Sequence, residues 1–196
     1  RSYSVTGVQT CALPICAIVG ETTETVRVKE NDFLIWKDEV EDFELQLTFR
    51  LQGGNSGVYY HARKRPPGET RGEPVVGTQA DFSADGRWTG VIMEYTLREV
   101  LAERGEQVLI TTNGTRQVTG SVGDPARLLE AVKLNDWNDY AIRVEGSRVK
   151  LAINGVRMCE LDDRDPKRLV RGWLALQVHT GPPMQVEFKD IFLKRL

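Results

Sequence analysis

The sequence predicts an all-β protein, an antiparallel β-sandwich or jelly roll with one or two short helices. Three observations lead to this fold class. Apolar and polar residues alternate at 42–51 and again at 172–179, a pattern typical of strands with one buried face. Asn154-Gly155 between two apolar runs is a strong hairpin signal. About ten short strand candidates follow one another with turn residues between them, as in sandwiches and jelly rolls.

The composition is that of an ordinary globular domain. The 196 residues are 28% charged and 40% hydrophobic, and the formal net charge is −2. This balance gives no field that would attract nucleic acid or an anionic membrane. No apolar run reaches the roughly 18 to 20 residues of a membrane span. We therefore expect neither nucleic acid nor a membrane as a partner.

The cysteines and the N-terminus carry little functional information. Three cysteines and two histidines form no metal-ligand spacing and no disulfide framework. Residues 1–15 resemble the conceptual translation of a sequencing adapter, and we exclude them from fold reasoning. We expect 1–16 to be an artefactual or disordered segment, with the native N-terminus missing. Residues 17–196 are expected to form a single jelly-roll domain.

The N-terminal third contains several strand candidates, at 17–20, 25–28, 32–36 and 42–51. A Gly-Gly-Asn-Ser-Gly turn at 53–57 then reverses the chain, because Gly and Asn tolerate positive φ angles. The return strand at 58–63 is expected to place three chemically distinctive side chains on one face, those of Tyr59, His61 and Arg63.

The middle of the chain begins with a loop rich in Pro and Gly at 64–74. The next strand, at 75–81, places Gln79 and Asp81 on the same face. Further candidates follow: a strand at 88–95, a helical turn or strand at 97–103, and a short strand at 108–110. Asp124-Pro125 opens a short helix, with Asp as N-cap and Pro at the first position.

The C-terminal third alternates most clearly. A strand at 140–144 precedes the Asn154-Gly155 hairpin, in which Ile153 should face Val156 and Leu151 should face Met158. The strand at 172–179 has its leucines inward and a polar face made of Trp173, Gln177 and His179. A last strand is expected within 184–196.

Both histidines therefore fall on polar strand faces that also carry an aromatic residue. If the two strands are neighbours, His61 and His179 would share a surface with Gln79 and Asp81. Aromatic rings that stack on sugars, beside amide and carboxylate groups that bind hydroxyls, would make a carbohydrate groove. The alternative is that each histidine is a solvated residue of an outer face. Asp81 and Glu94 could also form an acid and base pair.

Seven short motifs, in order, resemble the 3-keto-disaccharide hydrolase family over residues 17–196. They are Asp-Phe-Glu-Leu at 42–45, Gly-Asn-Ser-Gly-Val at 54–58, Gly-Thr-Gln-Ala-Asp at 77–81, Trp-Asn-Asp-Tyr at 137–140, Asn-Gly at 154–155, Ala-Leu-Gln-Val-His at 175–179, and Val-Glu-Phe-Lys-Asp-Ile at 186–191. The chain departs from the usual family pattern at His61, where Arg is frequent, and at Met93-Glu94-Tyr95, where Tyr-Asp-Glu is usual.

The resemblance implies a concanavalin A-like jelly roll of the lectin and glucanase type, acting on sugars oxidised at C3. A C3 ketone acidifies the C2 hydrogen, so a base can remove it, the glycosidic oxygen can leave by β-elimination, and water can then add. The substrate is thus expected to be a small carbohydrate. A divalent metal at the ketone oxygen is a possible cofactor of such chemistry. The resemblance also implies a bacterial periplasmic or secreted location.

The candidate site residues fall into two groups, and of these Gln79, Asp81, Gln177 and His179 match the family residue by residue. His179, Asp81 and Glu94 are expected to be catalytic, with His179 as base or metal ligand. Substrate-binding residues are expected at Gln79, Gln177, Tyr59, His61, Arg63, Arg98 and Trp173. The alternative function is that of a non-catalytic, lectin-like carbohydrate-binding domain.

Overall fold

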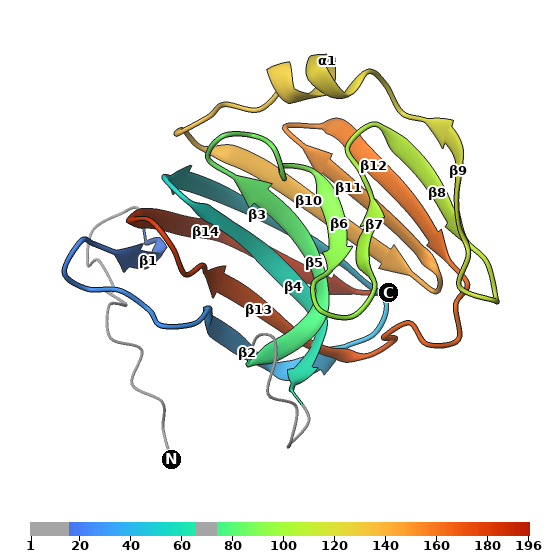
Figure 1. The fold of residues 1–196 in the computed structure, drawn as a ribbon, viewed down its shortest axis with the longest axis horizontal. Helices are drawn as coiled ribbons and strands as arrows, with labels where there is room; N and C mark the ends of the chain where they lie inside the picture. The colour runs from blue at the N-terminus through green and yellow to red at the C-terminus, as the bar shows by residue number, and fades with distance from the viewer. Residues whose placement is uncertain (1–15, 66–73) are drawn as a thin grey trace.

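The computed structural model describes residues 16–65 and 74–196, which form fourteen strands and one short helix (Figure 1). The expectations for residues 1–15, and for most of the loop at 64–74, lie outside these residues. The strands are arranged in two sheets, one of eight strands and one of six. The prediction of an all-β antiparallel sandwich is confirmed.

The larger sheet has the strand order β1 (Ile18–Thr22), β14 (Met184–Arg195), β3 (Phe43–Gln52), β10 (Asn138–Glu145), β11 (Arg148–Ile153), β12 (Val156–Asp163), β8 (Glu106–Ile110), β9 (Arg116–Ser121). The smaller sheet has the order β2 (Asp32–Val40), β13 (Gly172–Val178), β4 (Asn55–Lys64), β5 (Val75–Ser83), β6 (Val91–Glu94), β7 (Glu99–Ala102). Paired strands are antiparallel, except that β12 and β8 run parallel.

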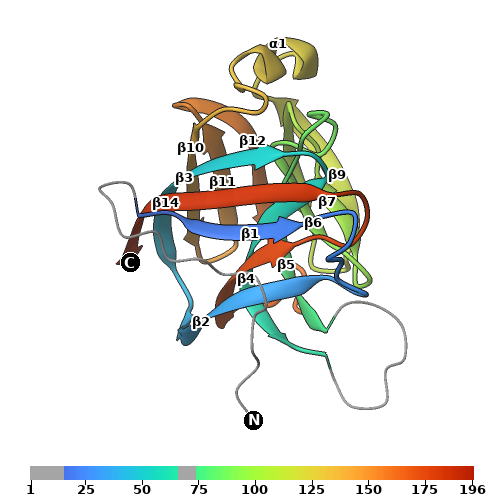
Figure 2. The same cartoon turned by 90° about the vertical axis from the view of Figure 1, so that its left-hand side faces the viewer.

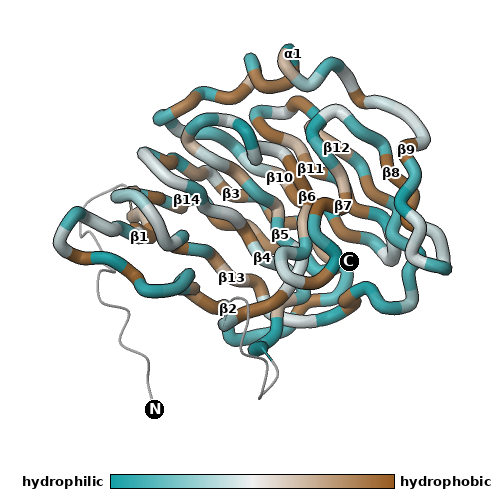
Figure 3. The backbone as a smooth tube through the Cα atoms, in the orientation of Figure 1, coloured by the Kyte–Doolittle hydropathy of each residue, from teal (hydrophilic) through white to brown (hydrophobic). Residues whose placement is uncertain are grey.

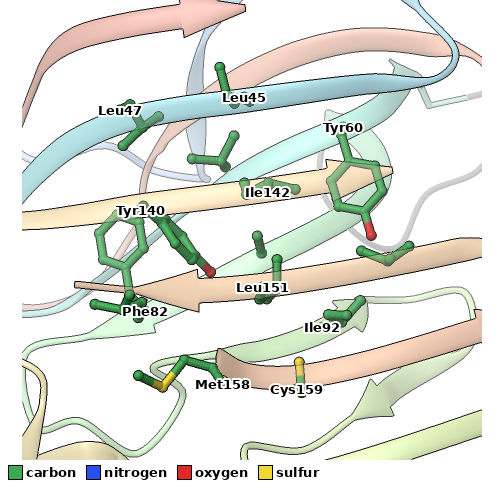
Figure 4. Packing of buried hydrophobic residues seen from close by; sticks show 14 of the residues in the cluster. Leu45, Leu47, Tyr60, Phe82, Ile92, Tyr140, Ile142, Leu151, Met158 and Cys159 are labelled. Atoms are coloured by element: carbon green, nitrogen blue, oxygen red, sulfur yellow. The ribbon is translucent and has the colours of Figure 1, made fainter. Parts of the chain in front are cut away.

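The main core lies between the two sheets. Apolar side chains of β3 and β10 from the larger sheet pack there against Val58, Tyr60 and Phe82 of the smaller one. Figure 4 shows Leu45, Tyr60, Ile142 and Leu151 reaching into this space from different strands. The alternation of hydrophilic and hydrophobic residues along many strands, visible in Figure 3, matches this arrangement because successive side chains point to opposite faces.

The helix α1 (Pro125–Glu130) begins as predicted. The Asp124 side chain accepts hydrogen bonds from the backbone N–H groups of Ala126 and Arg127, and Pro125 occupies the first turn. Figures 1 and 2 both place α1 at one end of the sandwich, far from β2. Leu128 is the buried side chain that joins the helix to the core, and Leu129 packs against the core as well.

Several local predictions need correction. Residues 25–28 form no strand, and β9 was not predicted; of the two alternatives left open for 97–103, a helical turn or a strand, the structure shows the strand, β7. In the Asn154-Gly155 hairpin Ile153 does pair with Val156, but Leu151 pairs with Cys159 and not with Met158. A β-bulge after Leu151 accounts for this shift, because it adds one residue to the opposite strand.

Candidate functional site

The candidate site is a cavity on the outer face of the six-stranded sheet. In β5, Ala80 and Phe82 point into the core, so Gln79 and Asp81 point to the opposite face. In β13, Leu174 belongs to the core and Leu176 and Val178 pack against it. Gln177 therefore shares the outer face with Gln79 and Asp81, and we call this surface the cavity face.

The cavity holds about 600 Å³ and brings together four residues named from the sequence: Gln79, Asp81, Gln177 and His179. A volume of this size is in the range of small-molecule sites. The rest of the described lining comes from the segment before β2, the start of β4, β6 and the turns beside it, the start of β7 and the residue after His179: Lys29, Glu30, Asn31, Asn55, Trp88, Met93, Tyr95, Glu99, Val100 and Thr180.

The two glutamines form a pair at the cavity wall. Gln79 Nε2 donates a hydrogen bond to Gln177 Oε1 at 2.9 Å, and both residues are buried. Gly57, in the neighbouring strand β4, leaves the space that the Gln79 side chain occupies: a Cβ at Gly57 would lie 2.4 Å from Gln79 Nε2. The pair is thus fixed by packing as well as by its hydrogen bond, which makes it a rigid source of amide groups for a ligand.

Asp81 is the carboxylate of this wall. It is buried, and its Oδ1 accepts a hydrogen bond of 2.8 Å from Asn55 Nδ2. Asn55 comes from the Gly-Gly-Asn-Ser-Gly turn, so the turn contributes to the site by holding this carboxylate. A carboxylate oriented by an amide, at the edge of a cavity, is suited to exchange protons with a bound hydroxyl or glycosidic oxygen.

His179 directly follows β13 and is partly buried at the cavity wall. Its Nδ1 lies at hydrogen-bonding distance from the backbone oxygen of Thr180. A carbonyl oxygen can only accept, so Nδ1 carries the proton in the neutral ring and Nε2 carries the lone pair. Thr180 is itself held by Asn31, whose Oδ1 accepts the Thr180 N–H at 2.7 Å. The ring can therefore accept a proton at Nε2, with its orientation set by the contact of Nδ1 with the Thr180 backbone oxygen.

Trp88, Met93 and Tyr95 supply apolar surface to the cavity and were missed by the sequence analysis. Met93 pairs with Gln79 across β5 and β6, which places both on the cavity face. This register could have identified Met93 once β5 and β6 were known to be neighbours. Trp88 and Tyr95 lie on the turns that flank β6, because the strand expected at 88–95 is confined to Val91–Glu94. Their rings provide the stacking surfaces that sugar sites use.

The expected surface shared by Tyr59, His61 and Arg63 does not form. His61 adopts φ +49° at a β-bulge in β4, and Ala62 takes the place on the cavity face. The His61 ring packs edge-on against Phe43 and Tyr60, and its nitrogens lie 2.9 and 2.8 Å from the backbone oxygens of Leu169 and Glu41. His61 and His179 thus lie on opposite faces, and the shared-groove argument was wrong.

Arg63 also points away from the cavity face. It pairs with Val76, whereas the neighbouring Val75 belongs to the apolar cluster on the cavity face. One inserted residue therefore reverses the direction of every later side chain in the strand. Arg63 is exposed and outside the cavity lining.

Glu94 and Arg98, expected in the site, form an ion pair on the core side of the sheet. Glu94 is 1% exposed and accepts hydrogen bonds from Thr78 Oγ1 at 2.8 Å and from Arg98 Nε at 2.7 Å. Arg98 also donates to Asp163 at 2.7 and 3.1 Å. Burial alone lowers the pKa of the Arg98 guanidinium, but its hydrogen bonds to Glu94 and Asp163 raise that pKa above its ordinary value. Neither residue lines the cavity. In β6, side chains alternate between the two faces of the sheet, so Met93 points to the cavity face and Glu94 to the core side.

Tyr59 and Trp173 lie on the cavity face but outside the cavity lining. Tyr59 is 1% exposed and packs edge-on against Phe33 of β2, with ring centres 5.0 Å apart. With Ala62, Val75 and Ala175 these aromatic residues form a small second apolar cluster. Their packing supports the sheet beside the cavity.

The described residues do not fit the divalent metal that the resemblance allows. Within 16–65 and 74–196, no group of three or more His, Cys, Asp or Glu side chains could hold an ion. Over the same ranges, no helix has the length and apolar character required to span a membrane.

Comparison with solved structures shows the same fold in several proteins. A proposed glycosyl hydrolase from Parabacteroides distasonis is 18% identical, with a TM-score of 0.58 over 100% of this chain and 93% of that one. Carbohydrate binding module CBM66 from Bacillus subtilis is 12% identical, with a TM-score of 0.52 over 91% and 94% of the two chains. A Bacillus subtilis protein of unknown function with a galectin-like fold is 11% identical, with a TM-score of 0.55 over 91% and 88%.

Sequence comparison gives a more specific result. No curated protein matches the chain at a significant level. The profile of the 3-keto-alpha-glucoside-1,2-lyase-like domain matches residues 8–194, which is nearly the whole chain. This chain belongs to the 3-keto-alpha-glucoside-1,2-lyase-like domain family.

Proposed function

We propose that this protein cleaves the glycosidic bond of 3-keto-glycosides by elimination followed by hydration. The observation that carries the proposal is the convergence of Gln79, Asp81, Gln177 and His179 on one cavity of about 600 Å³. Family membership supports the substrate class. The cavity adds a base, a carboxylate and paired amides on one wall, which are the groups that this chemistry needs.

In the proposed reaction, His179 Nε2 removes the proton from C2 of the bound sugar. The C3 ketone takes up the electron pair as an enolate, and the C1–oxygen bond then breaks to give a C1=C2 double bond. Asp81, in its acid form, protonates the departing glycosidic oxygen. Water adds to C1 and returns a proton to Asp81, while C2 recovers its proton from His179. The net reaction is hydrolysis, and both residues are restored.

The remaining lining residues are assigned to binding. The amide groups of Gln79 and Gln177 would hydrogen-bond the ketone oxygen or neighbouring hydroxyls, where negative charge develops in the enolate. Trp88 and Tyr95 would stack on sugar or aglycone rings. Asn55 and Asn31 would hold Asp81 and the backbone beside His179 in place.

The second candidate function is a non-catalytic carbohydrate-binding domain. Its support is the shared fold with the module CBM66 and the aromatic rings in the cavity lining. In that case Asp81 and His179 would bind hydroxyl groups without moving protons. The two functions therefore differ in turnover, although both require sugar binding.

A turnover assay separates the two functions. The protein is incubated with a 3-keto-glucoside, and released aglycone is measured for the unsubstituted chain and for Asp81→Asn and His179→Ala. Loss of a general acid or base costs about 10² to 10⁴ in rate, so both variants should lose at least about 100-fold in kcat. Asp139→Asn serves as control, since Asp139 pairs with Thr48 in the other sheet.

The control should keep the activity of the unsubstituted protein. If the unsubstituted chain binds sugars without releasing aglycone, the enzyme assignment is wrong and the binding-domain function stands. Undiminished turnover in both site variants would instead remove Asp81 and His179 from the proposed roles.

A further inference from the structure

Two residues of the cavity lining lie between the end of β6 and the start of β7: Tyr95 in the turn, and Glu99, the first residue of β7. Two non-glycine residues in this segment have left-handed backbone angles, Thr96 with φ +65° and Glu99 with φ +58°. Such conformations are unfavourable for residues with a side chain and persist only where the surroundings hold them. The wall formed by Tyr95 and Glu99 therefore depends on contacts outside the turn.

Arg98 supplies those contacts from the side of the turn that faces away from the cavity. Its guanidinium donates two hydrogen bonds to Glu94, at 2.7 and 2.8 Å, and two to Asp163, at 2.7 and 3.1 Å. A third carboxylate, that of Asp165, lies 3.5 Å from Nη1. Such paired, charge-assisted hydrogen bonds are among the strongest and most directional in proteins.

These bonds connect the turn to both sheets. Glu94 ends β6 and also accepts a hydrogen bond from Thr78 of β5, while Asp163 ends β12 in the eight-stranded sheet. The backbone N–H groups of Leu97 and Arg98 both bond to the Glu94 carbonyl oxygen, at 2.9 and 3.1 Å. Glu94 is thus the point where the turn, the guanidinium and the sheet meet, and it lies one residue before Tyr95.

We infer that Arg98 is a positioning residue of the candidate site: it fixes the Tyr95 and Glu99 wall relative to both sheets without touching the cavity. Its effect on catalysis rests on the proposed function, whereas its effect on the turn does not. Arg98 acts through geometry, because its donors point to carboxylates on the core side. Lysine keeps the charge but cannot reproduce a planar fork that serves two carboxylates.

The inference is tested with Arg98→Lys and a matched control, Arg50→Lys. Arg50 also pairs with a carboxylate, that of Glu187, but lies over Trp137 on the eight-stranded sheet. Hydrogen–deuterium exchange of residues 95–99 should accelerate by about tenfold in Arg98→Lys and stay unchanged in Arg50→Lys. With a 3-keto-glucoside, KM should rise by about tenfold while kcat changes less, as expected for a displaced binding wall.

Unchanged exchange in 95–99, or an unchanged KM, would overturn the inference. Asp163→Asn provides a second variant if Arg98→Lys does not fold, because it weakens the same bridge from the other sheet. It should accelerate exchange in the same residues, and normal exchange there would count equally against the inference. A double-mutant cycle with Tyr95→Ala tests the route: if Arg98 acts through Tyr95, Arg98→Lys adds little to the KM of Tyr95→Ala.

Failure of the proposed function can be recognised separately. If the unsubstituted protein shows no turnover, the exchange measurement still decides whether Arg98 holds the turn. Normal turnover with unchanged exchange in both variants would reject the role of Arg98 and leave the proposed reaction intact.

Discussion

Gly57 shows how a single missing side chain shapes the candidate site. It lies opposite Asp81 in the β4–β5 pairing, and the Gln79 side chain fills the space above it. Because its φ angle is not in the left-handed region, backbone strain does not require glycine here. The requirement comes from the 2.4 Å that would separate a Cβ from Gln79 Nε2. Gly57 thus belongs to the site although it brings no chemical group.

We expect Gly57→Ala to destabilise the protein by about 1 to 3 kcal/mol, because the added methyl group must displace Gln79 from Gln177. In an unobstructed strand the same change would stabilise by about 0.5 to 1 kcal/mol. Urea unfolding measures the difference. The control is the same substitution in a Gln79→Ala background, where the obstacle is gone and the cost should vanish. An equal cost in both backgrounds would contradict this explanation.

Among elements, the turn at 84–90 determines where Trp88 lies. Asp85 Oδ1 accepts hydrogen bonds from Ser83 Oγ at 2.6 Å and from the Arg87 N–H at 3.0 Å. Ser83 Oγ in turn accepts the Trp88 N–H at 3.0 Å. The hydrogen bond from the Ser83 hydroxyl, and to a smaller extent that from the Arg87 N–H, holds the pKa of Asp85 below its usual value. The ionised form of Asp85 therefore stabilises the folded turn.

This linkage predicts a pH dependence. Because the pKa of Asp85 is lower in the folded than in the unfolded protein, its ionised side chain stabilises the fold fully above the unfolded-state pKa of about 3.9. This stabilisation is lost as the pH falls through the pKa of the folded state. Asp85→Asn should be less stable at neutral pH, by less than about 1 kcal/mol since the residue is exposed, and the difference should shrink in acid. Thermal unfolding across pH measures it. Asp124→Asn, at an N-cap where Asn serves equally, should show no such trend.

Element geometry also explains what sequence reasoning could predict. The alternation in β3, β10 and β13 placed their buried faces correctly, because one face of each strand must pack against the core. Alternation in β5 put Gln79 and Asp81 on one face, and Gln177 joins them because β5 and β13 both pair with β4. The alternation gave the wrong face for His61, because a β-bulge there reverses the order of inward and outward side chains and no Gly in the sequence marks the bulge. Trp88 and Tyr95 were missed because the strand expected at 88–95 was too long, and both residues lie on turns beside β6. Strand pairing, which decides that Met93 and not Glu94 faces the cavity, is a long-range property.

For the molecule as a whole, charge is distributed so that the cavity is acidic. The formal net charge is only −2, but two exposed carboxylates, Glu30 and Glu99, line the described cavity beside Asp81, which the proposed reaction uses in its acid form. Lys29 is the single Lys or Arg of that lining within the described residues. Sites that hold anionic sugars use arginine and lysine, since these pair with carboxylates and phosphates. The cavity is therefore suited to neutral sugars.

We accordingly expect a neutral 3-keto-glucoside to bind more tightly than the corresponding 3-keto-glucuronide. Repulsion from partly solvated carboxylates amounts to about 1 kcal/mol, so the preference should be about five- to tenfold at low ionic strength. Salt screens such charges and should reduce the difference in affinity between the two sugars. Competition binding at two salt concentrations measures this difference. Glu99→Gln removes one carboxylate and should also reduce this difference in affinity, whereas Glu145→Gln, outside the cavity lining, should leave it unchanged. Tighter binding of the glucuronide, or a preference insensitive to both salt and Glu99→Gln, would show that shape and not charge selects the substrate.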